Sequence, residues 1–389
     1  MVTMESADNA LKTLYLGVIT EQLNTESNPL LAEIKQSTAD VWGKEIRRVA
    51  QHGLNGGVGA GTEDGDLPEA AGNNYGQFVT TLKNLYGTIE ISDKAMRASE
   101  NDAGAFVNLL NAEMEGLVKA ASFNFGRMLF GDGSGKLGEI TAVTDNTFTV
   151  TNVKNFVDGL LVDVYDADGN KTDFSPRRIV DFDRVNGTVT LGGTKITSGA
   201  QTIGGFMTVQ GSYNQEITGL GAIFKDTGTL YGLDRSKNKW LVPYMRNLAG
   251  NLTEHAIQTA IDHIEETVGG KINLIICSTG VRRSYMKYLN NYKRDVNTME
   301  LKSGFKAMSY NGIPIIADRF CPNNTMYLLN TEDFTLHQLC DWKWLEGEDG
   351  RVIKQVAGKP TYTATLVKYA DLICTRPCGQ AMITGINET

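Results

Sequence analysis

The chain has 389 residues, of which 41% are hydrophobic and 21% charged, and its formal net charge is −8. This composition is close to that of ordinary globular proteins and excludes wholesale disorder, and the acidic balance argues against a protein that grips duplex DNA through a basic face. No apolar run reaches the roughly 18 residues of a membrane span, and the N-terminus lacks the pattern of a signal peptide. We therefore expect a soluble protein made in a cytosol.

The first segment, residues 1–42, has the pattern of a short helical arm. Within residues 5–24, apolar side chains recur at the three- and four-residue spacing of a helix. A second short helix is expected after Pro29, because proline is tolerated in the first turn of a helix. The segment is too small to fold alone, so it must pack on another part of the protein.

The next segment, residues 43–91, combines two predicted strands with an unusual connection. Residues 43–52 and 77–91 are rich in the β-branched and aromatic side chains that favour strands. Between them, residues 53–76 contain many glycines and no basic residue. The charged residues of this connection are Glu63, Asp64, Asp66 and Glu69. We interpret the segment as a projecting β-arm, which needs a partner surface because an isolated two-stranded arm is only marginally stable.

A long helix and a small β module follow. Residues 102–130, within the segment 92–138, carry one continuous apolar stripe and predict a helix roughly 40 Å long, a length that suggests a structural spine. Residues 139–212 then alternate short apolar and polar runs with Asp-Gly, Asn-Gly and Gly-Gly turns. This pattern predicts an inserted all-β module.

The remainder alternates helices and strands. In the segment 213–345, Asn251 and Glu254 have the spacing of a helix cap, and glycines end that helix at 269 and 270. Further strands and a helix are expected at 272–277, 279–289, 312–317 and 325–329. The last segment, 346–389, contains long extended runs. The expected fold class is therefore α+β.

The sequence contains no recognisable catalytic or cofactor site. Gly131 to Leu137 lacks the spacing of a phosphate-binding loop, and Asp166 opens a calcium-like pattern that its later residues do not complete. The four histidines and five cysteines are scattered. Ser278 and Thr279 open a helix after a strand, where helix capping is a better explanation than an anion site. We expect no enzyme activity, no cofactor and no metal.

Four stretches carry a resemblance to a known family. They are Thr62–Pro68 (TEDGDLP), Tyr86–Ala95 (YGTIEISDKA), Gly312–Asp318 (GIPIIAD) and Met326–Phe334 (MYLLNTEDF). With the order of elements, they resemble the major capsid proteins of tailed phages, whose fold was first described for phage Hong Kong 97. The resemblance implies a structural subunit that self-assembles into the icosahedral head around double-stranded DNA. An encapsulin-like compartment shell is the alternative.

The resemblance also implies a role for each segment. Residues 1–42 would be the N-terminal arm, 43–91 the E-loop lying across a neighbouring subunit, and 92–138 the part of the peripheral domain that holds the spine helix. Residues 139–212 would be a lineage-specific insertion, 213–345 the axial domain, and 346–389 the peripheral C-terminal strands. Because the arm is preceded by only about forty residues, a separate scaffolding protein or an already removed scaffolding segment is expected.

Further partners and contacts are implied in the same way. Copies of the chain would form pentamers and hexamers of a virion shell made in the host cytoplasm. A portal and a decoration protein would join the shell, and DNA would be enclosed without sequence-specific contacts. No Lys–Asn crosslink is expected, because residues 53–76 lack lysine and residues 346–383 lack asparagine. The arm tip would dock on basic positions of a neighbour. The expected assembly contacts are Leu54, Glu63, Asp64, Asp66, Leu67, Pro68, Arg351, Lys354 and Lys359.

Two other classes of protein remain as rivals. An enzyme built on residues 220–345 would need a pocket of converging titratable groups, which the sequence does not assemble. A β-rich adhesion protein would need a secretion signal, and residues 1–16 do not have one.

Overall fold

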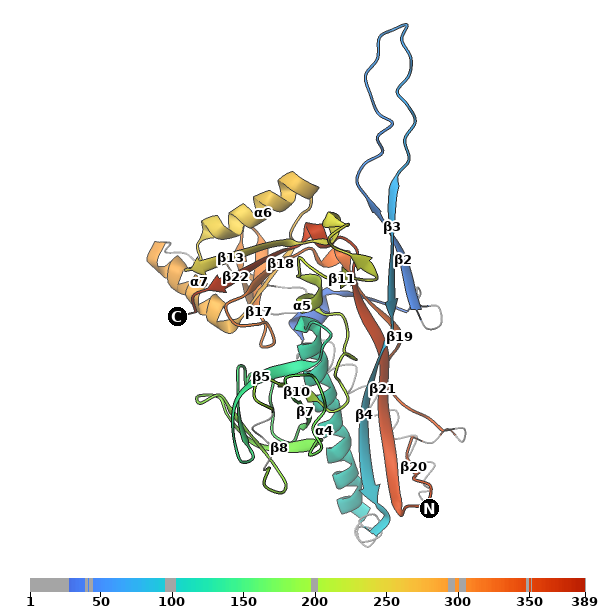
Figure 1. Cartoon of the computed structure of the whole chain (residues 1–389), viewed down its shortest axis with the longest axis vertical. Coiled ribbons are helices and arrows are strands. Elements are labelled where there is room, and N and C mark those ends of the chain that lie inside the picture. The colour runs from blue at the N-terminus through green and yellow to red at the C-terminus, as the bar shows by residue number, and fades with distance from the viewer. Residues whose placement is uncertain are drawn as a thin grey trace.

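The computed structural model describes residues 28–38, 41, 45–94, 103–196, 202–292, 298–300, 306–347, 350 and 352–388. The predicted helix within residues 5–24 and the basic position Arg351 lie outside these residues. The chain forms a long peripheral sheet, a seven-stranded sheet with helices, a β-barrel, and an arm that projects beyond all three (Figure 1). The expected α+β class is confirmed.

The peripheral sheet is built around one long strand. β21 (Thr361–Cys374) pairs antiparallel with β4 (Lys83–Ser92) over ten residues on one side. On its other side it pairs with β19 (Phe334–Trp344) and with the short β20 (Lys354–Gln355), and β1 (Lys35–Ser37) extends the sheet beyond β19. The alternating burial of β4 marks the face that packs on the long helix.

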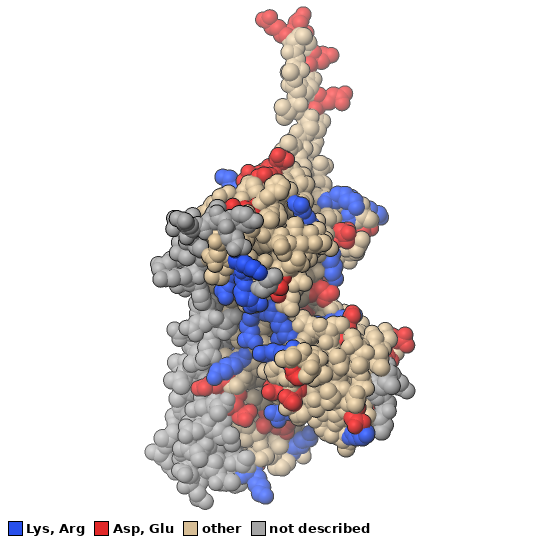
Figure 2. Space-filling view, turned by 90° about the vertical axis from the view of Figure 1, so that its left-hand side faces the viewer, with Lys and Arg blue, Asp and Glu red and all other residues tan. Residues whose placement is uncertain are grey.

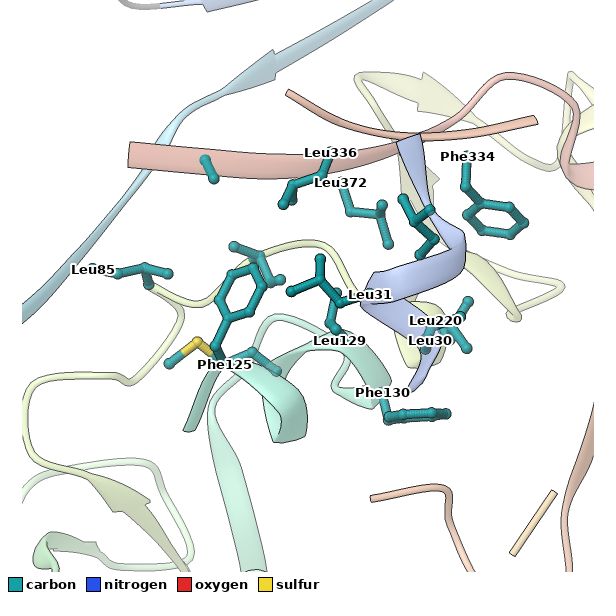
Figure 3. Close-up of a cluster of buried hydrophobic side chains, with 14 of the residues drawn as sticks. Leu30, Leu31, Leu85, Phe125, Leu129, Phe130, Leu220, Phe334, Leu336 and Leu372 are labelled. Atoms are coloured by element: carbon teal, nitrogen blue, oxygen red, sulfur yellow. The ribbon is translucent and has the colours of Figure 1, made fainter. Parts of the chain in front are cut away.

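That helix is α4 (Ala103–Phe130), which confirms the helix expected at 102–130. It lies on the peripheral sheet, and Gly87 of β4 permits close contact, because a Cβ there would be 2.9 Å from Leu117 Cδ1. The short helix α2 (Pro29–Glu33), expected after Pro29, packs against the end of α4. Figure 3 shows the shared core. Its labelled side chains are Leu30, Leu31, Leu85, Phe125, Leu129, Phe130, Leu220, Phe334, Leu336 and Leu372.

The middle of the seven-stranded sheet is buried on both faces. In β14 (Leu274–Cys277), Leu274 and Ile276 face the core around α4, whereas Ile275 and Cys277 face the helices α6 (Glu254–Val268) and α7 (Thr279–Tyr292). Burial on both faces explains its unbroken apolar run. The strand order is β13 (Tyr244–Gly250), β22 (Ala381–Ile386), β18 (Met326–Leu329), β14, β17 (Ile313–Ala317), β16 (Lys306–Tyr310) and β15 (Thr298–Glu300).

The module expected at 139–212 is a closed six-stranded barrel with its own core. Closure leaves no free strand edge, which suits a unit attached at the side of the molecule. Its strands are β5 (Lys136–Thr144), β6 (Thr147–Val150), β7 (Leu161–Tyr165), β8 (Arg177–Asp183), β9 (Thr188–Leu191) and β10 (Phe206–Val209). The short connecting elements are α5 (Leu220–Ile223), β11 (Thr229–Leu230), β12 (Leu233–Asp234), and the 3₁₀ turns η3 (Lys239–Leu241), η4 (Thr331–Asp333) and η5 (Pro377–Gly379).

The structure corrects several expected boundaries. The single strand expected at 77–91 is two strands, β3 (Asn74–Thr81) in the arm and β4 in the peripheral sheet. β19, assigned with 213–345, belongs to the peripheral sheet, and β22, assigned with 346–389, completes the seven-stranded sheet. Sequence patterns identify strands but not their partners, which explains these errors.

The cap of α6 is a further correction. Thr253, not Asn251, is the N-cap, because its side chain accepts a hydrogen bond from the Ala256 N–H.

Candidate assembly interface

The arm, residues 45–81, is a hairpin of β2 (Glu45–His52) and β3 joined by a long tip, residues 53–73. The strands pair over eight residues each, from Glu45 opposite Thr81 to His52 opposite Asn74. Beyond them the tip stands clear of the body, with Leu54, Val58 and Leu67 about nine-tenths exposed (Figure 1). Large apolar side chains in such a position typically mark a surface that another molecule covers.

The tip is also acidic. Glu63, Asp64, Asp66 and Glu69 are all exposed, and red side chains mark the end of the projecting arm in Figure 2. A turn closed by the Gly65 N–H and the Thr62 carbonyl, 3.3 Å apart, folds back the end of the tip. The tip therefore presents both negative charge and apolar surface.

The base of the arm, in contrast, is packed on the body. Phe78 is fully buried, with ring centroids 5.2 Å from Tyr231 and 5.6 Å from Trp240, and His52 stacks on Trp240 at 4.6 Å. A Cβ on Gly76 would lie 2.8 Å from Trp240 Cζ2, so only glycine fits without displacing that ring. This anchor was not among the predicted contacts, although an aromatic residue inside an alternating strand is a signal for one.

Polar contacts also hold the base. The Arg48 guanidinium lies 3.4 Å from His337 Nε2, and Thr80 Oγ1 donates to the Asp371 carboxylate at 2.5 Å. Asp371 is fully buried and also accepts from the Thr218 N–H at 2.7 Å. Burial raises the pKa of Asp371, while these hydrogen bonds oppose that change. The arm is thus anchored at its base and exposed at its tip.

The predicted contact residues occupy opposite ends of the molecule. The six tip residues all lie in the exposed tip, at the top of Figure 1, whereas Lys354 is on β20, at the bottom. Lys354 is half-buried and Lys359 is exposed. One copy does not bring the two groups together, so any contact between them requires a second copy.

Other residues considered from the sequence have structural roles. Ser278 Oγ accepts from the Val281 N–H at 3.2 Å and donates to Glu388, which confirms helix capping. Asp166 accepts from the Asn170 N–H at 2.8 Å, as in an ordinary turn. Within the described ranges, no three His, Cys, Asp or Glu side chains are grouped closely enough to hold a metal ion, and no helix has the length and apolar character to cross a bilayer.

Comparison with known proteins finds likeness in structure only. No protein-family model and no curated protein sequence matches the chain. A chain of the cyanophage A-1(L) capsid asymmetric unit has a TM-score of 0.58 and 14% identity, over 92% of this chain and 93% of that chain.

Two further structures are less similar. They are the SrpI encapsulin complex from Synechococcus elongatus PCC 7942 (TM-score 0.46, 9% identity, 95% of each chain) and the capsid of a native GTA particle (0.48, 11%, 93% of this chain and 91% of that chain). The cyanophage comparison, at 14% identity, establishes the fold alone: this chain has the fold of a cyanophage capsid chain.

Proposed function

We propose that the chain is the major capsid protein of a tailed phage, a structural subunit without catalytic activity that builds the icosahedral head around double-stranded DNA. Its fold, shared with a cyanophage capsid chain over more than nine-tenths of both chains, supports this function. In this proposal the arm is the E-loop, α4 is the spine helix, the β4–β21 sheet belongs to the peripheral domain, and the seven-stranded sheet forms the axial domain.

One observation carries the proposal. The tip leaves three large apolar side chains about nine-tenths exposed, while the base of the same arm is fixed by a buried aromatic cluster. A fixed base holds the tip away from its own body, so the apolar surface can be covered only by another molecule. Identical subunits that each cover a neighbour's arm form closed symmetric assemblies with large obligate interfaces.

The remaining parts of the proposal follow from this role. The tip contacts Leu54, Glu63, Asp64, Asp66, Leu67 and Pro68 would lie on a neighbouring copy, with Arg351, Lys354 and Lys359 as the basic acceptor. Copies would form pentamers and hexamers in a virion made in the host cytoplasm. A scaffolding protein, a portal and a decoration protein would act with the shell.

The test is assembly of the purified chain. Expressed alone or with its scaffolding protein, the chain should form closed particles that electron microscopy shows to have icosahedral symmetry. A chain that stays a monomer at high concentration, with the tip folded onto its own body, would contradict the proposal. Particles that form in uninfected cells and enclose protein cargo instead of DNA would favour an encapsulin-like compartment.

A further inference from the structure

A cleft of about 1050 Å³ lies where three parts of the molecule meet. The middle of α4 forms its floor, the barrel loop 157–161 and Arg178 form one wall, and Arg319 and Phe320 form the other. Figure 2 shows basic side chains gathered in the hollow between the seven-stranded sheet region above and the barrel at the lower right. The cleft is large for a small-molecule pocket and open to solvent, which suits a peptide segment.

The cleft offers positive charge that is not tied up in ion pairs. Lys119, Arg178 and Arg319 line it and are exposed, and within the described part of the chain none of them forms an ion pair. The Arg319 guanidinium is held at 5.0 Å over the Phe123 ring and 5.1 Å over the Phe320 ring, which fixes its position without satisfying its charge. Such cations attract an anionic partner.

The cleft is also apolar. Phe123, Leu160 and Leu161 line it, and Leu161 is 43% exposed. On the floor, Gly116 and Ala120 place no bulky side chain between the α4 backbone and an incoming segment.

We propose that this cleft receives the arm tip of a second copy, an inference that rests on the proposed function and identifies a second acceptor for the tip. Charge complementarity supports this occupant. The segment 61–70 combines four carboxylates with Leu67 and Pro68, and the cleft combines three cations with apolar side chains.

DNA matches the cleft less well than the tip does. Glu113 and Asp158 also line the cleft, and they would repel phosphates and the tip carboxylates alike. The apolar side chains of Phe123, Leu160 and Leu161 distinguish the two partners, because they can cover Leu67 and Pro68 of the tip but match nothing on a phosphodiester backbone. A peptide backbone, unlike a phosphodiester, brings N–H groups that can donate to these two carboxylates. The mixture of charges and apolar groups therefore favours a peptide.

The first experiment measures binding without requiring shells. A fluorescent peptide with the sequence of residues 61–70 is titrated into the full-length wild-type chain and into the double variant Lys119→Glu/Arg178→Glu. Neither side chain makes a hydrogen bond among the described residues, so the variant should fold. We expect roughly tenfold weaker peptide binding, because reversal replaces several small attractions by repulsions. The comparison variant, Lys354→Glu/Lys359→Glu, carries the same change of charge at the acceptor predicted from the sequence, so it measures how much of the peptide binding that other site contributes.

The second experiment uses charge exchange in assembling chains. Lys119→Glu/Arg178→Glu should lower particle yield, and adding Glu63→Lys/Asp66→Lys to the same chain should restore it, which a folding defect would not allow. In the binding experiment, the inference is wrong if the peptide binds the cleft variant as well as wild type, or if only Lys354→Glu/Lys359→Glu loses binding. It is also wrong if a short DNA duplex displaces the peptide and binds more tightly. In the assembly experiment, it is wrong if the charge exchange does not restore particle yield. Wild-type chains that bind the peptide through the cleft but never form particles would contradict the proposed function and leave this inference standing.

Discussion

Asp318 follows β17 at the junction between the seven-stranded sheet and the barrel, and the residue is 2% exposed. Burial raises its pKa from 3.8 to about 6, although the Phe320 N–H at 2.8 Å and the positive charges of Lys154 and Arg319 oppose the change. Because the folded pKa is above the unfolded value, the folded state favours the protonated carboxyl. This contribution to stability is present below pH 3.8 and is lost as the pH rises through about 6.

The substitution Asp318→Asn should remove the loss of stability that ionisation of this buried carboxyl causes as the pH rises. A pKa difference of this size corresponds to about 3 kcal/mol above pH 7, and to about half as much at pH 5. The asparagine Oδ1 can still accept from the Phe320 N–H, so the local geometry is retained. The variant should therefore be more stable than wild type at pH 7.5, and its advantage should shrink at pH 5.

Urea unfolding of unassembled chains, at equal protein concentration and at each pH, measures the free energy of unfolding of wild type and of the variant. Asp181→Asn, at an exposed position on β8, is the matched control and should change little at either pH. If Asp318→Asn is no more stable than wild type at pH 7.5, or if its advantage is the same at both pH values, burial does not control this carboxyl group.

Three further predictions concern the arm and its support. Arg127 and Glu216 form a buried ion pair between α4 and the segment after the barrel. Arg127→Met should lower the free energy of unfolding by about 3–5 kcal/mol, because it leaves the Glu216 charge buried and unpaired, and adding Glu216→Leu should restore most of that loss. Equal losses in the single and the double variant would contradict this. Gly76→Val should displace Trp240 and loosen the base of the arm, seen as a shift of tryptophan fluorescence, whereas an unchanged spectrum would refute the close contact. A glutamate-specific protease should cut the tip rapidly in free chains and slowly in particles, and equal rates would show that assembly leaves the tip uncovered.

The elements of this fold that depend on local pattern could be predicted from the sequence. The apolar stripe of α4 can be recognised within a few helical turns, and the continuous apolar run of β14 within a few residues. The partners of β19 and β22 could not be predicted, since each joins a sheet that is distant in the chain. The break at Leu82, between β3 and β4, was missed because both flanking segments favour strands.

The candidate interface divides in the same way. Glycine content and uniform negative charge are local properties of the chain, and they suffice to mark the tip as exposed. The cleft escapes such reasoning, because Lys119, Arg178 and Arg319 come from a helix, a barrel strand and a loop that are far apart in sequence. Each is an ordinary surface cation in its local context, and only the folded arrangement brings them together.

The position of β22 has a consequence for biosynthesis. This strand lies between the edge strand β13 and β18, so β13 cannot join the seven-stranded sheet until the ribosome has synthesised residue 386. A nascent chain can complete its barrel much earlier, but Met326 and Leu328 then lack the strand that pairs with them. If the chain builds the proposed shell, a copy still under translation would lack a complete sheet, and only a finished subunit would be able to assemble.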